Sequence, residues 1–310
     1  MLCSFLTVFF ISCKKEDTQN NPSADNTAYF EDYPYDDPAT INDQSSSPVD
    51  SAASVDDSAG PNSVSMSAVT TNAYTRKNLM FNYLTESTDA LSKTACGSSN
   101  YWCSIAKWAS YSSQRTSAYS RSGGYSTRYE LRKSDGDVAG SKRTETNRAS
   151  KGESVLRCER WYGVSYYLPS SFVSDKAPEV ITQWHTTAAG SPPLVVWTQN
   201  GQWSIGYFGD KRKIIGNYVT NKWTDFVFHV KWSPYSDGFI EAWKDGVKVF
   251  TYTGANIYNT SYGAYMKTGI YKWPWKSGSY GSTTTNRIVY IDDVRIGNSL
   301  ATYNDVAPGP

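Results

Sequence analysis

Residues 223–252 read WTDFVFHVKWSPYSDGFIEAWKDGVKVFTY, and this stretch decides the fold class of the chain. It contains three runs rich in aromatic and β-branched residues, which favour strands. The runs are 223–232, 239–244 and 247–252. Asp237-Gly238 and Asp245-Gly246 separate them, and Asp-Gly pairs favour the left-handed backbone of tight hairpin turns. The stretch therefore predicts consecutive β-hairpins.

The same pattern continues on both sides of this stretch. Asn200-Gly201 marks another hairpin turn between two runs of strand-forming residues. The further runs are 155–168, 180–185, 194–198, 203–208, 264–272 and 287–296. Many short strands at regular spacing are typical of sandwiches and barrels. We therefore predict an all-β fold, a β-jelly roll sandwich with a concave substrate groove.

The N-terminal residues predict export. Residues 1–12 form an apolar run that is too short to span a bilayer but has the length of a signal-peptide core. The end of this run before Cys13 resembles a bacterial lipoprotein cleavage box, and the charged residues 14–17 resemble a surface-export signal. We expect 1–13 to be a signal peptide ending at lipidated Cys13, which makes the protein an extracytoplasmic, surface-exposed outer-membrane lipoprotein. An ordinary secretory signal cut elsewhere is the alternative.

The charge of the chain is divided between two regions. Residues 14–74 carry two Lys and eleven Asp or Glu, a net charge of −9, and are rich in Ser, Asp and Asn. They lack the apolar content that would offset the entropy of ordering, so we predict a flexible linker. Residues 75–310 carry 28 Lys or Arg and 18 Asp or Glu, a net charge of +10, and form the predicted folded domain. A basic domain favours a polyanionic partner.

The cysteines fit an oxidising compartment. Cys96 and Cys103 lie seven residues apart and are expected to close a short disulfide loop. Cys158 lies in a strand-like run and is interpreted as a buried thiol. The chain has only two His, His185 and His229, which argues against a multi-histidine metal centre.

Three segments place reactive side chains on one face of a strand, because alternate residues of a strand point to the same side. The first is R-Y-E-L-R at 128–132, the second Q-W-H at 183–185, and the third Y-M-K-T-G-I-Y at 265–271. We expect the three polar faces to meet in one groove. The side chains concerned are Arg128, Glu130, Arg132, Gln183, His185, Tyr265, Lys267 and Tyr271. Gly269 is expected to remove bulk and let a substrate approach the sheet.

These segments resemble the R-x-E-L-R, Q-x-H and Y-x-K-x-G-x-Y motifs of jelly-roll alginate lyases. Residues 223–271 resemble more closely the group of heparin lyase I and glucuronan lyase. The resemblance covers roughly residues 125–297. Two positions differ from the alginate lyase pattern. Lys272-Trp273 stands where that pattern continues with Asn-Gln, and Trp184 stands in the middle of Q-x-H, where Ile or Val is usual. The resemblance therefore implies a polysaccharide lyase with residues 75–310 as its catalytic domain. The first expected substrate is a polymer of glucuronate or iduronate type, and the second is alginate.

The resemblance also implies roles for these residues. Tyr271 is expected to protonate the departing glycosidic oxygen, and either Tyr271 or His185 to remove the C5 proton of a uronate. Gln183, with Arg128 or Arg132, is expected to neutralise the uronate carboxylate. Lys267 is expected either to lower the pKa of Tyr271 or to bind the carboxylate. Trp273 could stack on a sugar, and Lys211 and Arg212, in a loop, could hold distal anionic groups.

Two other function classes remain as alternatives. A glycoside hydrolase would need two carboxylates that flank the bond, and no paired-acid strand is visible. A non-catalytic carbohydrate-binding module would leave the His, Tyr, Lys and Gln without a purpose. We expect no cofactor and no catalytic metal, with a structural calcium ion left open. The expected partners are an anionic polysaccharide and, through the lipid anchor, the outer membrane. We expect a monomer that binds no nucleic acid.

Overall fold

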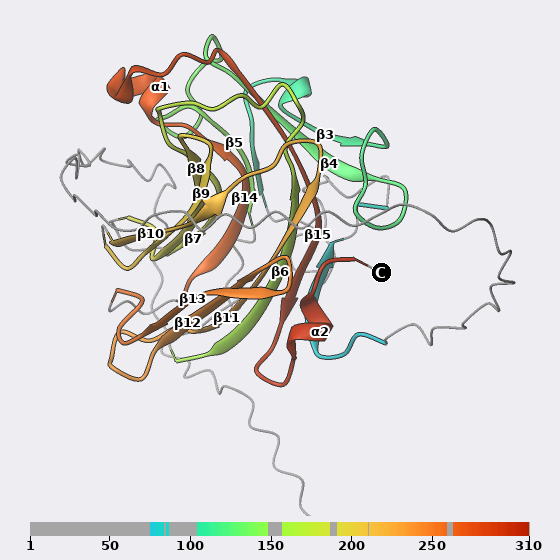
Figure 1. Ribbon diagram of the computed structural model, residues 1–310, viewed down its shortest axis with the longest axis vertical. Coiled ribbons are helices and arrows are strands. Elements are labelled where there is room, and N and C mark those ends of the chain that lie inside the picture. Colours follow the sequence, from blue (N-terminus) through green and yellow to red (C-terminus); the bar gives the residue numbers. More distant parts are fainter. Residues whose placement is uncertain are drawn as a thin grey trace, which may run out of the picture. The chain divides into compact units, whose positions relative to one another are not determined.

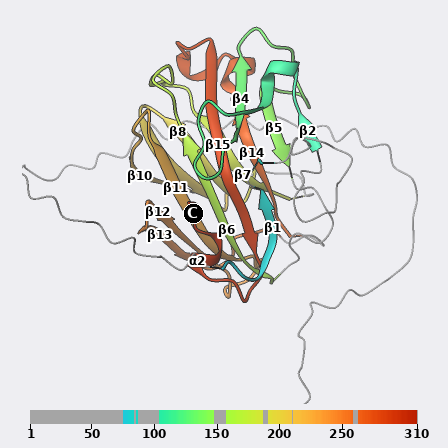
Figure 2. The same ribbon diagram turned by 90° about the vertical axis from the view of Figure 1, so that its right-hand side faces the viewer.

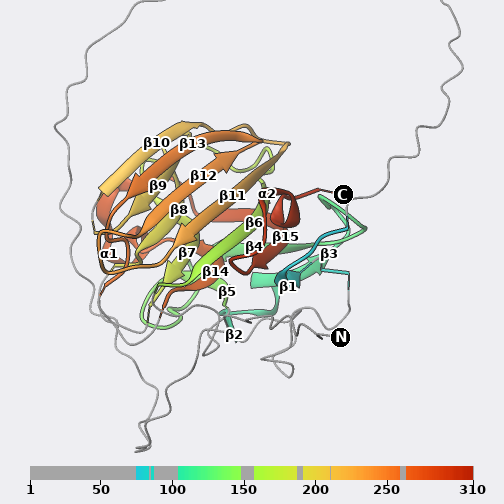
Figure 3. The ribbon, with the colours of Figure 1, turned by 90° about the horizontal axis from the view of Figure 1, so that it is seen from below.

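Two antiparallel β-sheets pack face to face in the part of the chain that the structure describes (Figures 1 and 3). The structure is a computed structural model, and it describes residues 75–83, 85–86, 104–147, 157–186, 191–209, 211–258 and 263–309. All strand pairs are antiparallel, and this confirms the predicted all-β jelly roll sandwich.

The first sheet, sheet A, has the strand order β13-β12-β11-β6-β15-β4-β3 among the described residues, and β1 also pairs with β15. Its strands are β1 (Leu79–Tyr83), β3 (Ser113–Thr116), β4 (Ser126–Arg132), β6 (Glu159–Tyr167), β11 (Trp223–Lys231), β12 (Phe239–Lys244), β13 (Val247–Thr253) and β15 (Asn286–Gly297). Short helices complete the fold: α1 (Pro274–Ser277), α2 (Tyr303–Val306), η1 (Ser110–Ser112) and η2 (Ser279–Gly281). Helix α2 packs against β6, β11 and β15 (Figure 2).

The second sheet, sheet B, has the order β10-β9-β8-β7-β14-β5-β2 in the described ranges. Its strands are β2 (Ser104–Ala106), β5 (Arg143–Asn147), β7 (Glu179–His185), β8 (Leu194–Gln199), β9 (Gln202–Tyr207), β10 (Lys211–Asn217) and β14 (Tyr265–Tyr271). Strands β5, β14 and β7 therefore lie side by side in sheet B. The residues that they bring together are far apart in the chain: Glu145 and Gln183, for example, are 38 residues apart.

The core lies between the two sheets and consists largely of aromatic rings. Trp184 of β7 meets Tyr162 of β6 edge-on, at 5.2 Å between ring centroids, and Phe228 of β11 at 4.8 Å. All three side chains are fully buried. Because Trp184 faces inward, its neighbours Gln183 and His185 face the outer side of sheet B.

The predicted strand runs and hairpin turns are confirmed with small shifts of their ends. Asn200 and Gly201 have φ of 53° and 80°, and Asp245 and Gly246 have φ of 49° and 82°. Positive φ at both central residues is the geometry that Asn-Gly and Asp-Gly pairs favour in two-residue hairpins. Cys158 is buried, as expected for a structural thiol.

The prediction of a loop at Lys211 and Arg212 is wrong, because both residues lie in edge strand β10. This strand exposes most of its side chains and, among the described strands, pairs with β9 alone, so its sequence lacks the apolar alternation that marks a half-buried strand. Strand β5 was missed for a related reason: its inward residues are Thr144 and Thr146 rather than large apolar side chains.

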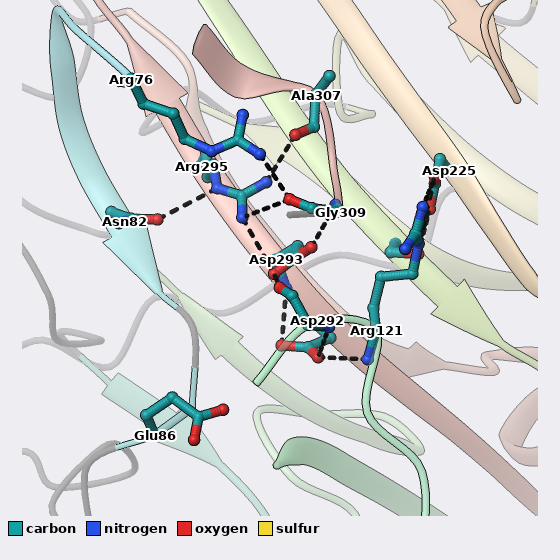
Figure 4. A network of polar contacts seen from close by, with 12 residues as sticks. Arg76, Asn82, Glu86, Arg121, Asp225, Asp292, Asp293, Arg295, Ala307 and Gly309 are labelled. Carbon is teal, nitrogen blue, oxygen red and sulfur yellow. Dashed lines mark hydrogen bonds and ion pairs between the residues drawn. The ribbon is translucent and has the colours of Figure 1, made fainter. Parts of the chain in front are cut away.

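A network of polar contacts joins the two ends of the described chain on the outer side of sheet A (Figure 4). Arg295 of β15 donates to the carbonyl of Ala307 at 2.7 Å and forms an ion pair with Asp293 at 3.1 Å. The backbone N–H of Gly309 donates to Asp293, and Arg76 donates to the carbonyl of Gly309. These contacts hold residues 76 and 309 side by side, and we call them the terminal clasp.

Several predictions lie outside the described residues. They concern the signal peptide and Cys13, the linker up to residue 74, and the Cys96–Cys103 disulfide. Within the described ranges, no helix is long and apolar enough to cross a membrane.

Candidate active site

The outer face of sheet B gathers the polar side chains of three neighbouring strands. Strand β14 lies between β5 and β7, with Lys267 opposite both Asn147 and Gln183. Tyr265 pairs with His185, and Tyr271 pairs with Arg143, so polar residues on three strands share one surface. Their inward neighbours, such as Met266 and Ile270, belong to the core. The sandwich thus brings the second and third predicted segments together, as expected.

Glu145 of β5 organises the centre of this face. Its carboxylate accepts a hydrogen bond from the Nε2 of Gln183 and lies 3.4 Å from the Nη1 of Arg143. All three side chains are buried. Since a carboxylate only accepts hydrogen bonds, Glu145 fixes which end of the Gln183 amide points toward it, and one of the two Nε2 protons remains for another acceptor.

Lys267 adds a second cation to this face. Its side chain is buried, and burial lowers its pKa, although Glu145 raises it and Arg143 lowers it further. Among the described side chains of this cluster, the protonated Arg143 and Lys267 carry one positive charge more than the carboxylate of Glu145 balances. This local excess suits a ligand that brings one carboxylate.

The surroundings of His185 keep its imidazole ring neutral. Its Nδ1 lies in hydrogen-bond contact with the carbonyl oxygen of Thr186. A carbonyl cannot donate, so Nδ1 must carry the proton, and in the neutral ring Nε2 is then unprotonated. Burial, followed by the charge of Lys267, lowers the pKa of His185 to about 4. The imidazole is therefore neutral, with a basic Nε2, at any pH well above that value.

Aromatic rings border the cluster. The Arg143 guanidinium lies 4.2 Å from the ring centre of Tyr271, and the Tyr271 and Trp273 rings are 5.6 Å apart. On the other side, Tyr265 lies 5.9 Å from His185, and the Nζ of Lys267 lies 5.6 Å from the Tyr265 ring. Tyr271 and Trp273 are half-buried, so each keeps an accessible edge beside the buried charges.

The first predicted segment does not join this face. Arg128, Glu130 and Arg132 lie on β4, which belongs to sheet A. Tyr129 and Leu131 of the same strand point into the core, so the three charged side chains point to the outer side of sheet A, away from His185. There Glu130 bridges the two guanidinium groups, with Arg132 Nε at 2.6 Å. The expectation that Arg128 or Arg132 shares a groove with Gln183 is wrong.

Strand β5 supplies the residues that the sequence interpretation missed. Arg143, Glu145 and Asn147 alternate along this strand just as Arg128, Glu130 and Arg132 do along β4. The signal was the spacing Arg-x-Glu-x-Asn in 143–147. It was overlooked because the intervening residues are Thr, which read as a polar loop.

Gly269 has a different role from the one predicted. Its φ is +138°, and a Cβ at this position would lie 2.2 Å from the backbone oxygen of Thr144. The pairing of β14 with β7 also shifts register between Thr268 and Tyr271. The glycine is therefore required by the close approach of β5 to an irregular strand, and the expected approach of a substrate does not explain it.

Lys211 and Arg212 point in different directions from β10. Arg212 donates to Ser204 at 3.0 Å and lies 5.0 Å over the ring of Trp197, on the outer side of sheet B. Lys211 instead lies 5.2 Å from the ring of Tyr252, a residue of sheet A. Arg212 therefore shares the face of the site, and Lys211 does not.

No group of three or more His, Cys, Asp or Glu side chains in the described ranges is arranged to hold a metal ion. A structural calcium ion, which the sequence left open, stays open.

Comparison with known proteins assigns the class. The model of the family described as "Polysaccharide lyase" matches residues 94–295, more than half of the chain. The chain belongs to this family, and the protein is a polysaccharide lyase. No curated protein matches the chain.

Many solved structures match this chain, and two of them illustrate the shared fold. The endo-β-1,4-glucuronan lyase of the fungus Trichoderma reesei is 20% identical, with a TM-score of 0.57, and the match covers 66% of this chain and 93% of that one. The marine PL-14 alginate lyase of Aplysia kurodai is 11% identical, with a TM-score of 0.51 over 72% of this chain and 100% of the other. At these identities the likeness establishes the jelly-roll fold.

Proposed function

We propose that this lyase cleaves an anionic polysaccharide containing uronic acid by β-elimination, leaving a C4–C5 unsaturated uronate at the new end. The observation that supports this most is the cluster of Arg143, Lys267, Gln183, His185 and Tyr271 on one face of sheet B. It combines a local excess of positive charge, a neutral imidazole base and a phenol. These are the groups that elimination at a uronate requires.

The carboxylate of the uronate has to be neutralised before its C5 proton becomes acidic enough to remove. The second Nε2 proton of Gln183, together with Arg143 and Lys267, can donate to this carboxylate and stabilise the negative charge that develops in the transition state. Arg143 replaces Arg128 and Arg132 in this role, since it contacts Glu145 and Tyr271 within the cluster.

The proton transfers fall to His185 and Tyr271. His185 takes the C5 proton on Nε2 when that proton and the leaving oxygen lie on opposite sides of the ring. When they lie on the same side, Tyr271 takes the proton as the phenolate, and the same proton then passes to O4. In both cases Tyr271 donates a proton to the departing O4, so the C4–O4 bond breaks as the C4–C5 double bond forms.

The substrate class follows from charge and resemblance. A polymer of glucuronate or iduronate type, such as ulvan, glucuronan or a glycosaminoglycan, is proposed first, and alginate second. The net charge of +10 on residues 75–310 supports an anionic polymer.

The test is to mix purified residues 75–310 separately with glucuronan, ulvan, heparan sulfate and alginate and to follow ultraviolet absorbance. The unsaturated uronate absorbs, and only elimination produces it, so absorbance is expected to rise with at least one polymer. New reducing ends without absorbance would indicate a hydrolase. Retained binding without any cleavage would indicate a binding module.

We expect His185 to titrate far below the ordinary histidine value. Burial and Lys267 lower its pKa to about 4, compared with about 6.5 for an unperturbed imidazole. NMR can follow the two histidine signals of the chain against pH, and the variant His185→Gln assigns them. If His185 is the base, the acid limb of kcat/KM should also lie near pH 4. A His185 midpoint near 6.5 would contradict the neutral, buried imidazole.

The lowered pKa of His185 also makes the stability of the fold depend on pH. The unfolded chain protonates His185 at higher pH than the folded chain does, so this residue favours unfolding as pH falls from about 6.5 to about 4.

We also propose, from the sequence alone, that the protein is exported and anchored to the outer membrane through lipidated Cys13 and acts there as a monomer. Mass spectrometry of the membrane fraction would test the lipid on Cys13, with Cys13→Ala as the comparison.

A further inference from the structure

A band of aromatic rings leads from the catalytic cluster across sheet B. The Tyr271 ring lies 5.6 Å from Trp273, and Trp273 lies 6.2 Å from Trp197 of β8. The guanidinium of Arg212, on β10, lies 5.0 Å from the ring centre of Trp197. Four residues from three separated segments thus form one continuous strip, which begins at the proposed acid and ends in a cation.

The end of this strip is fixed in position. Arg212 donates through Nη2 to the hydroxyl of Ser204 at 3.0 Å and through Nη1 to the side-chain oxygen of Gln199. The flat guanidinium lies over the indole, and its side chain is exposed at the surface. An arginine held in this way is preorganised for an incoming carboxylate or sulfate, because less side-chain entropy is lost on binding.

The strip runs across the strands of sheet B. The order β14-β7-β8-β9-β10 places four strand spacings between Tyr271 and Arg212. Neighbouring strands lie about 4.8 Å apart, so the path along the sheet is roughly 19 Å. That length of backbone exceeds one sugar unit, which favours contact of Arg212 with a different unit from the uronate whose bond is cleaved.

We propose that Trp273, Trp197 and Arg212 form a distal subsite that binds a second anionic unit of the same polymer chain. The indole rings support the sugar backbone, and Arg212 pairs with the carboxylate or sulfate of that unit. The proposal rests on the proposed function for the identity of the polymer. It adds that productive binding requires negative charge on at least two units separated along the chain.

Strand β10 offers a matched control. Lys213 follows Arg212 directly, is exposed, and points to the opposite side of the strand. Arg212→Gln and Lys213→Gln remove the same charge from the same strand, and only the first removes it from the strip. Long-range attraction of a polyanion would respond to both changes alike.

The test compares long and short substrates. For the polymer cleaved by the wild-type protein, Arg212→Gln is expected to raise KM about tenfold, the loss expected for a charge-assisted hydrogen bond, with kcat nearly unchanged. On a fragment too short to reach β10, Arg212→Gln should equal the wild type. Lys213→Gln should equal the wild type on both substrates, and Trp273→Leu should resemble Arg212→Gln on the polymer.

Affinity electrophoresis of the same variants in glucuronan, ulvan, heparan sulfate and alginate tests the distal subsite separately from the proposed elimination chemistry. If no polymer yields unsaturated ends but Arg212→Gln still weakens binding selectively, the elimination chemistry fails and the subsite stands. If Arg212→Gln changes neither KM nor binding, or if Lys213→Gln has an equal effect, the subsite is overturned.

Discussion

Replacing Tyr271 by Phe is expected to lower kcat by about 10³-fold or more, within the range that general acid–base groups contribute. Phenylalanine keeps the ring that lies beside Arg143 and Trp273 and removes only the hydroxyl. Without this hydroxyl, O4 must leave as an unprotonated alkoxide. The loss is expected whether Tyr271 or His185 removes the C5 proton, because the leaving group needs the proton in both cases.

The measurement is the initial rate of absorbance increase, together with the binding constant for the polymer. Binding should change little, since Arg143, Gln183 and Lys267 are untouched. Tyr290→Phe is the control, because it makes the same chemical change on β15 of sheet A. A Tyr271→Phe protein that keeps more than a tenth of the wild-type kcat would rule out the hydroxyl as the proton donor.

The second large effect is expected at Lys272, where Lys272→Met should lower stability by about 3–5 kcal/mol. This lysine is fully buried, and its Nζ lies 3.1 Å from Asp175 and 3.3 Å from Glu179. Arg287 of sheet A also pairs with Glu179, and its Nε lies at 2.8 Å, so the group joins the two sheets at one end of the sandwich. Removing the lysine leaves buried carboxylates with too little positive charge.

Thermal unfolding would measure this effect, with an expected drop in Tm of roughly 10 °C for a domain of this size. Lys276→Met is the matched control, since Lys276 is partly exposed and its pair with Asp137 is 3.6 Å long, for which little effect is expected. A drop of less than 2 °C for Lys272→Met would contradict the proposed role of the network.

The pH dependence gives a second check on this network. Burial raises the pKa of Asp175, but the hydrogen bonds from Ser282 and Thr284, with Lys272, hold that pKa well below its usual range. A depressed carboxyl pKa adds stability above about pH 4, its unfolded value, and that stability is lost as the pH falls further. The variant should therefore lose part of the acid sensitivity of the wild type.

The network also explains why the residues after Tyr271 differ from the alginate lyase pattern. Lys272-Trp273 stands where alginate lyases continue with Asn-Gln. Lys272 is anchored to Asp175 and Glu179, while Trp273 packs between Tyr271 and Trp197. In this chain the two residues after Tyr271 therefore serve as an anchor and as part of the aromatic strip.

Strand periodicity predicted the fold well and the site only in part. Hairpin turns at Asn200-Gly201 and Asp245-Gly246 and the apolar alternation of buried strands are local signals, so the sequence reveals them directly. The same alternation shows that Gln183 and His185 share a face. It cannot show which sheet a strand joins, because that depends on pairing between residues far apart in the chain.

The pair of strands β4 and β5 illustrates this limit. Both alternate Arg and Glu, but only β5 pairs with β14. The inward side chains of β4, Tyr129 and Leu131, are large and apolar, so the sequence predicts this strand clearly. The inward side chains of β5 are Thr144 and Thr146, which do not give the apolar alternation of a buried strand. Arg143 was therefore overlooked in favour of Arg128, although Arg143 contacts the ring of Tyr271.

The terminal clasp fixes where the described part of the chain begins. Arg76 and Gly309 meet on the outer side of sheet A, and the proposed catalytic cluster lies on the outer face of sheet B. Under the proposed anchoring through Cys13, the point at which the sandwich is attached and the surface proposed to bind the polymer therefore belong to opposite sheets.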